Sequence, residues 1–259
     1  MTKQVNRNST SSTDPTDHRT VAEITELVGG LAHELRNPLS TLMINLKLLT
    51  EDLANEEHHF DDVRRRSLLR VDVLHREAKR LQGLFEEFLH LAEPHRLDLV
   101  STDIHTIVHR LATFVEPMAR AHGVRLTTET SPNPVQCLVD QDRVYRALLN
   151  IALNALEAMP DGGEMTLRVA RDGAFGLIAI SDTGVGIAEE QRQRIFRPFH
   201  STKTDGTGLG LSITRRIVEE HGGTLSFQSE LARGTTFEIR LPLDPNEDSG
   251  SVTVPGVEG

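Results

Sequence analysis

A histidine and its neighbours in the first third of the chain have residue types that could transfer a chemical group. Glu34 directly follows His33 in a predicted helix, and Asn37 lies one turn further along the same exposed face. A neutral imidazole with a free lone pair is a nucleophile, and an adjacent carboxylate can accept or orient the proton on its other nitrogen. His33 could therefore accept a transferred group; the alternative is a surface histidine without a catalytic role.

Amide and carboxylate side chains in the second half could bind a nucleotide and a metal ion. Asn150 and Asn154 lie four residues apart on a predicted helix and share a face. Their oxygens could ligate Mg²⁺, although two amides are also typical of a solvated face. Asp182 ends a predicted strand and could accept a hydrogen bond from an exocyclic amine, while Gly184 and Gly186 would let the backbone approach a ligand. An ordinary turn is the alternative here.

A glycine-rich segment, Gly206-Thr207-Gly208-Leu209-Gly210, opens another predicted helix. Free N–H groups and the helix dipole at such an end favour phosphate binding. The segment lacks the Lys-Ser/Thr ending of a P-loop, and the expected elements around it do not form a βαβ unit. Lys203 precedes it and could reach a terminal phosphate, or it could be a solvated loop charge.

Two long helices are expected to carry the histidine. Apolar residues recur every three or four positions from about residue 21 to 53 and again from 68 to 92, on either side of a short polar break. Pro38 lies inside the first helix and should kink or loosen it. A single antiparallel hairpin leaves its apolar seam half exposed, so we expect two copies to form a dimeric four-helix bundle.

The pattern changes after Pro94 to a mixture of helices and strands. Helices are expected over residues 104–122, 141–159 and 208–221, and strands over 124–129, 135–139, 164–171, 175–181, 224–229 and 235–241. This order predicts an α+β protein in which the hairpin precedes an α/β sandwich. The expected division is a disordered tail (1–19), the hairpin (20–94), a linker (95–102), the sandwich domain (103–243) and a second disordered tail (244–259).

Composition limits the class of protein. The 259 residues carry a formal charge of −10, so nothing attracts the chain to nucleic acid or anionic lipid in general. No apolar run approaches the roughly 20 residues of a membrane span, and the first residues do not form a signal peptide. The single cysteine, Cys137, fits a reducing compartment. We therefore expect a cytoplasmic protein without a membrane span or a nucleic-acid partner.

Several motifs resemble those of one family. The string Ala32-His33-Glu34-Leu35-Arg36-Asn37-Pro38-Leu39 resembles the phosphoacceptor box of two-component sensor histidine kinases. The paired asparagines, Asp-x-Gly-x-Gly, Phe196-Arg197-Pro198-Phe199, the second glycine box and Gly234-Thr235-Thr236-Phe237 follow in the order of that family's catalytic domain. That domain has the ATP-binding fold shared with gyrase, the Hsp90 chaperones and MutL. The resemblance covers about residues 20 to 243.

The resemblance implies a role for each of these residues. His33 would be phosphorylated from Mg-ATP, with Glu34 as general base and Asn37 orienting a water that dephosphorylates the partner. Asn154 would ligate Mg²⁺. Asp182 would bind the adenine amine, helped by Thr235 through a water, and Gly184 and Gly186 would let the backbone close over the base. Asn150 would support the phosphates, and the glycines that surround them would be Gly206, Gly208 and Gly210. Residues 196–205 would form a lid anchored by Phe196 and Phe199.

The resemblance also implies partners and leaves alternatives. A homodimer would pass the phosphoryl group to an aspartate on the receiver domain of a separate response regulator. Gyrase-type ATPases carry a glutamate base where Asn150 stands, so transfer to a protein nucleophile is favoured over hydrolysis. A form that acts mainly as a phosphatase through Asn37 and a non-catalytic ATP-binding module are the alternatives. Because no sensor domain is recognisable, input is expected through a separate sensory protein or through the helical bundle itself.

Overall fold

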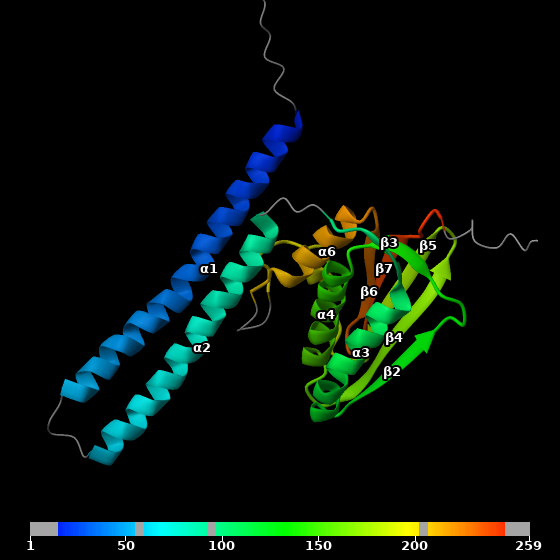
Figure 1. The fold of residues 1–259 in the computed structure, drawn as a ribbon. Helices are drawn as coiled ribbons and strands as arrows, with labels where there is room; N and C mark the ends of the chain where they lie inside the picture. The colour runs from blue at the N-terminus through cyan, green and yellow to red at the C-terminus, as the bar shows by residue number, and fades with distance from the viewer. Residues whose placement is uncertain (1–14, 55–59, 93–96, 202–206, 247–259) are drawn as a thin grey trace, which may run out of the picture. The chain divides into compact units, whose positions relative to one another are not determined.

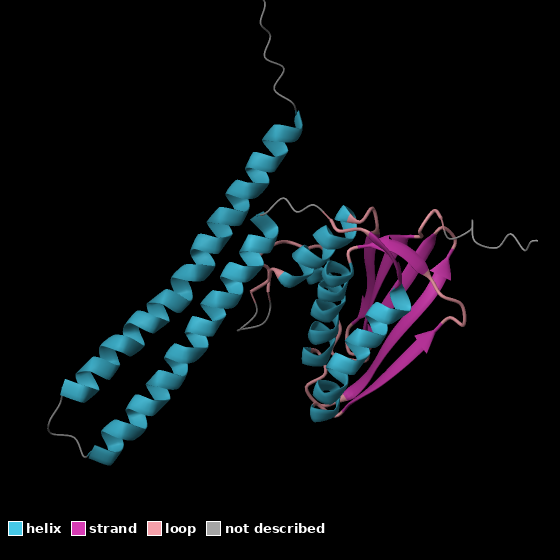
Figure 2. Cartoon of the chain, viewed as in Figure 1, coloured by secondary structure: helices cyan, strands magenta, loops and turns pink. Residues whose placement is uncertain are grey.

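A computed structural model describes residues 15–54, 60–92, 97–201 and 207–246. The chain divides into two compact units, residues 1–88 and 89–259, each of which is considered by itself (Figure 1). The first is helical and the second combines helices with a sheet (Figure 2). The predicted α+β class, with a helical hairpin before an α/β sandwich, is confirmed.

The hairpin consists of helices α1 (Pro15–Ala54) and α2 (Phe60–Ala92). Pro38 lies inside α1 without ending it, and ion pairs such as that between Arg70 Nη1 and Asp52 Oδ2, 2.6 Å apart, connect the two helices. The predicted tail 1–19 is too long, because α1 already begins at Pro15. Proline is favoured at the first position of a helix, where its missing N–H has no partner to lose.

Many large apolar side chains of the hairpin remain exposed. They come from both helices and include Leu39, Met43, Ile44, Leu46, Leu53, Leu68, Leu69, Val71 and Phe85. Two helices can cover only one side of each other's apolar stripe, and a single hairpin of this composition is left with apolar surface in water. Within the described ranges, no helix combines the length and apolar character that crossing a bilayer requires.

The second unit contains a five-stranded sheet in the order β2-β4-β5-β7-β6. The strands are β2 (Val124–Thr130), β4 (Gly163–Asp172), β5 (Phe175–Asp182), β6 (Thr224–Glu230) and β7 (Gly234–Pro242), and every neighbouring pair is antiparallel except β2 with β4. A small antiparallel sheet pairs β1 (Val100–Asp103) with β3 (Gln136–Val139).

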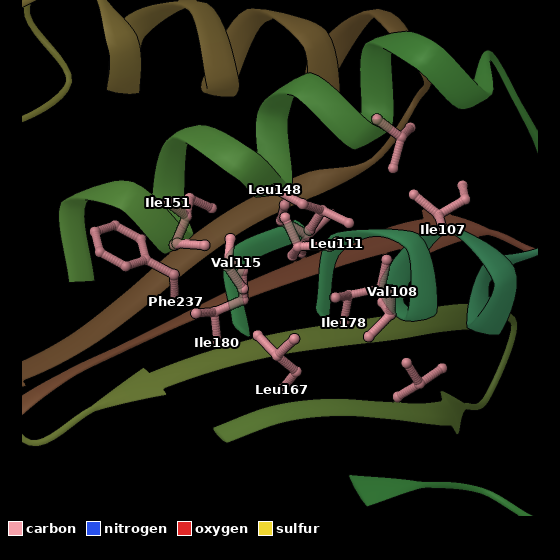
Figure 3. Close-up of a cluster of buried hydrophobic side chains, with 14 of the residues drawn as sticks. Ile107, Val108, Leu111, Val115, Leu148, Ile151, Leu167, Ile178, Ile180 and Phe237 are labelled. Carbon is pink, nitrogen blue, oxygen red and sulfur yellow. The ribbon is translucent and has the colours of Figure 1, made fainter. Parts of the chain in front are cut away.

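Helices cover one face of the large sheet (Figures 1 and 2). They are α3 (Ile104–Ala121), α4 (Gln141–Glu157) and α6 (Gly210–Glu220), while α5 (Glu189–Arg192) is a single turn. Figure 3 shows the core between them, where Leu111 and Leu148 from the helices meet Leu167 and Ile180 from the sheet, all at most 2% exposed. This core fixes β5, which carries Asp182, and α4, which carries Asn150 and Asn154.

Two predicted boundaries of this unit are wrong. The linker predicted over 95–102 contains most of strand β1, because a four-residue strand is too short to show a period. The tail predicted over 244–259 begins too early, because Asp244 is buried and its N–H donates to Gln136 O at 2.8 Å. A hydrogen bond with Ser101 and others with Asn246 lower the pKa of the Asp244 carboxyl.

Candidate functional site

The carboxylate of Asp182 lies buried at the end of β5. Its Oδ1 accepts hydrogen bonds from Gly184 N at 2.9 Å and from Thr235 N at 3.2 Å, and Thr235 lies directly opposite it on β7. Burial raises the pKa of Asp182, and the two backbone hydrogen bonds only partly offset that effect. One oxygen is thus held by the backbone, which fixes the orientation of a buried acceptor group.

The glycines after Asp182 allow close contact between backbone segments. A β-carbon at Gly184 would lie 2.5 Å from Ala158 O at the end of α4, and Val185 N donates to that same carbonyl at 3.0 Å. Gly186 has a φ of +71°, and a β-carbon there would collide with Glu230 O. Both glycines thus allow close contact with the protein's own backbone, and the expected approach to a base stays a prediction.

The glycine box leads into α6 as predicted. Gly208 has a φ of +69°, and a β-carbon there would lie 2.6 Å from the backbone of Phe199 and His200. The box therefore packs against the motif that contains Phe199. Thr207 Oγ1 accepts from Leu209 N at 3.3 Å, and α6 begins at Gly210. Leu209, the N-cap residue of α6, makes no capping hydrogen bond through its side chain, and the first N–H groups of a helix have no partner within it.

The start of α6 meets the first asparagine of α4. A β-carbon at Gly210 would collide with the Asn150 side chain, whose Nδ2 donates to Thr214 Oγ1 at 2.9 Å. Asn154 lies one turn further along α4 and is half-buried. The structure thus brings Asn150 against the glycine box, 60 residues away in sequence, whereas Gly206 and Lys203 lie outside the described residues.

The predicted lid is described only as far as Ser201. The Phe196 ring packs edge-on against Phe227 of β6, with ring centroids 5.6 Å apart, and its role as an anchor of a lid stays a prediction. Phe199 has a φ of +60°, a conformation that L-residues seldom adopt. The rest of the lid segment, residues 202–205, falls outside the described residues.

The phosphoacceptor residues lie in the middle of α1. The His33 side chain lies outside the described residues, and Asn37 is exposed. Glu34 faces α2, where Arg80 Nη2 lies 4.0 Å from its Oε2; both side chains are about one-fifth exposed, at 21% and 22%. Sequence reasoning missed Arg80, because no period or spacing within α2 distinguishes it from the other arginines of that helix.

Comparison with known families covers both units. The model described as His Kinase A (phospho-acceptor) domain matches residues 23–96, which include the His33 motif. The model described as histidine kinase-, DNA gyrase B- and HSP90-like ATPase matches residues 139–245, which include Asp182 and the glycine box. The chain belongs to the two-component histidine kinases.

Curated histidine kinases resemble this one along most of its length. Sensor histidine kinase ZraS of Escherichia coli K12 is 34% identical over 220 residues, which are 84% of this chain and 45% of that protein. Sporulation kinase C of Bacillus subtilis strain 168 is 31% identical over 220 residues, 84% of this chain and 49% of that protein. This histidine kinase chain spans about half the length of the curated relatives it matches.

Solved histidine kinase structures share the fold. Full-length ShkA in complex with AMPPNP has a TM-score of 0.60 and 28% identity, over 85% of this chain and 46% of that one. The catalytic domain of ThkA has a TM-score of 0.52 and 28% identity, over 56% of this chain and 95% of that one. ThkA in complex with the response regulator protein TrrA has a TM-score of 0.71 over 89% of this chain and 65% of that one, and at 22% identity it supports the fold alone.

Proposed function

We propose that this chain is a protein-histidine kinase that transfers the γ-phosphoryl group of Mg-ATP to His33. The observation that carries the proposal is the arrangement of the second unit, where Asp182 is a buried, oriented acceptor and Asn150 lies against the start of α6. A base-binding group and a phosphate-binding helix end thus belong to one unit, in a chain whose first helix carries His33 and Glu34.

The nucleotide would be held at both ends. The Asp182 carboxylate would accept a hydrogen bond from the adenine amine, and the N–H groups at the start of α6 would donate to phosphate oxygens. Lys203 and Gly206 would complete the phosphate contacts. An amide oxygen, phosphate oxygens and water are the ligands that Mg²⁺ prefers, so the half-buried Asn154 side chain fits a bound ion. Mg²⁺ would neutralise charge on the phosphates.

The chemical step would need little covalent work from the protein. The unprotonated imidazole nitrogen of His33 would form a bond to the γ-phosphorus, while the bond from that phosphorus to the bridging oxygen breaks and ADP leaves. Glu34 would accept the proton of the other imidazole nitrogen, because the phosphorylated ring would be cationic if that proton stayed. The protein's contribution is to bring the groups together and to stabilise charge.

Two partners are part of the proposal. Transfer onward to a receiver-domain aspartate of a separate response regulator is expected from membership of the family, and ThkA, whose fold this chain shares, has been solved in complex with the response regulator protein TrrA. The exposed apolar side chains of α1 and α2 support a homodimer in which two hairpins form a four-helix bundle. A cytoplasmic location and a separate sensory protein remain predictions.

The decisive experiment is incubation of the full chain with γ-labelled ATP and Mg²⁺. We expect a protein-bound label that acid removes and base does not, as for a phosphoramidate, and we expect His33→Gln to abolish it. Absence of acid-labile label on the wild type, in the presence of measurable ATP binding, would contradict the kinase proposal and favour a non-catalytic ATP-binding module.

The metal assignment has its own test. Asn154→Asp should abolish labelling, because an added negative charge beside the phosphates opposes them, while dimerisation measured by light scattering persists. Retained labelling would show that Asn154 does not ligate Mg²⁺. Asn37→Ala should leave labelling intact and slow removal of phosphate from a receiver domain, since only the dephosphorylating water depends on Asn37. Unchanged dephosphorylation in this variant would exclude the phosphatase role.

A further inference from the structure

The hydroxyl of Ser229 connects two segments of the nucleotide site. Ser229 lies on β6, directly opposite Thr235, and it is half-buried. Its Oγ lies 2.8 Å from Ile187 N, 3.1 Å from Gly234 O and 2.9 Å from Thr235 Oγ1. Ile187 follows the glycines after Asp182, and Thr235 is the residue opposite Asp182 on β7. The loop at Ile187 and strand β7 therefore both contact Ser229 Oγ.

Only one arrangement of hydrogens makes all three contacts hydrogen bonds. A hydroxyl donates once and accepts twice, a backbone N–H can only donate, and a carbonyl can only accept. Ser229 must therefore give its single hydrogen to Gly234 O and accept from Ile187 N. Its contact with Thr235 is then a hydrogen bond only if the Thr235 hydroxyl is the donor.

This arrangement fixes what Thr235 offers to a ligand. With its hydrogen directed to Ser229, the Thr235 hydroxyl presents only lone pairs. The Asp182 carboxylate beside it also accepts, and the backbone N–H groups of Gly184 and Thr235 already donate to Asp182 Oδ1. A water held by both groups would donate its two hydrogens to them and would itself accept from the base. The site therefore requires a donor from the base.

We infer that Ser229 is a positioning residue that holds the Thr235 hydroxyl as an acceptor and thereby makes the nucleotide site select a 6-aminopurine over a 6-oxopurine. The inference rests on the proposed ATP site and adds to it the cause of base selectivity. Adenine has an amine at the 6-position, with two N–H donors. Hypoxanthine has a carbonyl oxygen there, which would face lone pairs and lose its hydrogen bonds.

Arg192 provides a matched control. Its Nη2 donates to Ser229 O at 2.6 Å, and its Nε donates to Ile187 O at 3.5 Å. Arg192 thus ties the same two segments together through their carbonyls, without a contact to the Ser229 or Thr235 hydroxyl. Loss of Arg192 should loosen the site for every nucleotide alike, whereas loss of the Ser229 hydroxyl should change the preference between bases.

The test is titration calorimetry of the 259-residue chain with ATP and with ITP, each with Mg²⁺. In Ser229→Ala the Thr235 hydroxyl can turn and donate to a carbonyl, so the ratio of ATP to ITP affinity should fall about five- to tenfold, the value of about one hydrogen bond. Ser229→Thr keeps a hydroxyl and should restore the ratio. Arg192→Leu should weaken both nucleotides by a similar factor.

A double variant separates the inference from a loss of structure. In a Thr235→Val background, Ser229→Ala should not lower the ratio further, because the hydroxyl through which it acts is absent. An unchanged ratio in Ser229→Ala, or an equal fall in Arg192→Leu, would overturn the inference while leaving the proposed kinase intact. Failure of the wild type to bind either triphosphate would overturn the proposed ATP site and the inference with it.

Discussion

Replacement of Asp182 by asparagine separates the fold of the nucleotide site from its chemistry. The asparagine Oδ1 can still accept from Gly184 N and Thr235 N, which lie 2.9 and 3.2 Å from the carboxylate oxygen. The amide NH₂ would then replace the acceptor oxygen that faces the adenine amine, so a donor meets a donor. Loss of a hydrogen bond to a charged group costs about 1.5–3 kcal/mol, which weakens ATP binding roughly 10- to 150-fold.

The same variant has an opposite effect on stability. Because burial raises the pKa of Asp182, ionisation of this carboxyl opposes folding. The wild type therefore loses stability as the pH rises from the unfolded pKa, about 4, through the higher folded pKa. Asparagine does not ionise, so the variant lacks this loss. The free energy of unfolding of Asp182→Asn minus that of the wild type should therefore be larger at pH 7 than at pH 4.

Calorimetric ATP titration and thermal unfolding at the two pH values check both effects. The exposed Asp161, changed to asparagine, controls for the loss of one negative charge and should alter neither quantity. Wild-type affinity for ATP in Asp182→Asn would refute the assignment of Asp182 to the base. If the stability of Asp182→Asn relative to wild type fell between pH 4 and pH 7, the reasoning from burial would be refuted.

Further variants test the supporting structure. Gly234→Ala should cost roughly 2–4 kcal/mol in urea unfolding, because φ is +104° and the β-carbon would strike a β5 carbonyl; Gly173→Ala, at φ +61° in open space, should cost only about 1–2 kcal/mol. Asp103→Ala should cost about 1 kcal/mol at pH 7, because it removes the α3 N-cap. Burial raises the pKa of Asp103, but hydrogen bonds from His105 and Val135 outweigh it and lower the pKa. In thermal unfolding, the part of this cost that depends on the charge should therefore be lost as the pH falls from about 4 through the lower folded pKa. Arg80→Leu should slow labelling about two- to fivefold with ATP affinity unchanged, since it removes a partly exposed ion pair to Glu34; unchanged labelling would exclude that role.

The pattern of residue types predicted these elements, through a helical period in α4 and a short run of buried residues in β5. The predicted helix over 141–159 is α4 (Gln141–Glu157), and the predicted strand over 175–181 is β5 (Phe175–Asp182). Errors fall where a segment is short or its burial is not periodic. Strand β1 has four residues, and Asp244 is buried through tertiary contacts that leave no pattern in the sequence around it.

The site was predictable to the extent that single residues carry its chemistry. Asp182 and the start of α6 lie where the motifs place them, because an acceptor at a strand end and glycines before a helix act locally. Ser229 and Arg80 were missed, because their roles depend on partners in other segments: the loop at Ile187 in one case and Glu34 on the opposite helix in the other.

The glycines near Asp182 explain how a motif can specify a site assembled from distant segments. A β-carbon at Gly184 would strike the end of α4, one at Gly186 would strike the end of β6, and one at Gly234 would strike Asp182 O itself. Each glycine is thus required by a neighbouring backbone before any ligand is considered. The positions of these glycines indicate which segments pack closely around the Asp182 carboxylate. A motif in the sequence therefore predicts which distant segments lie together in the fold.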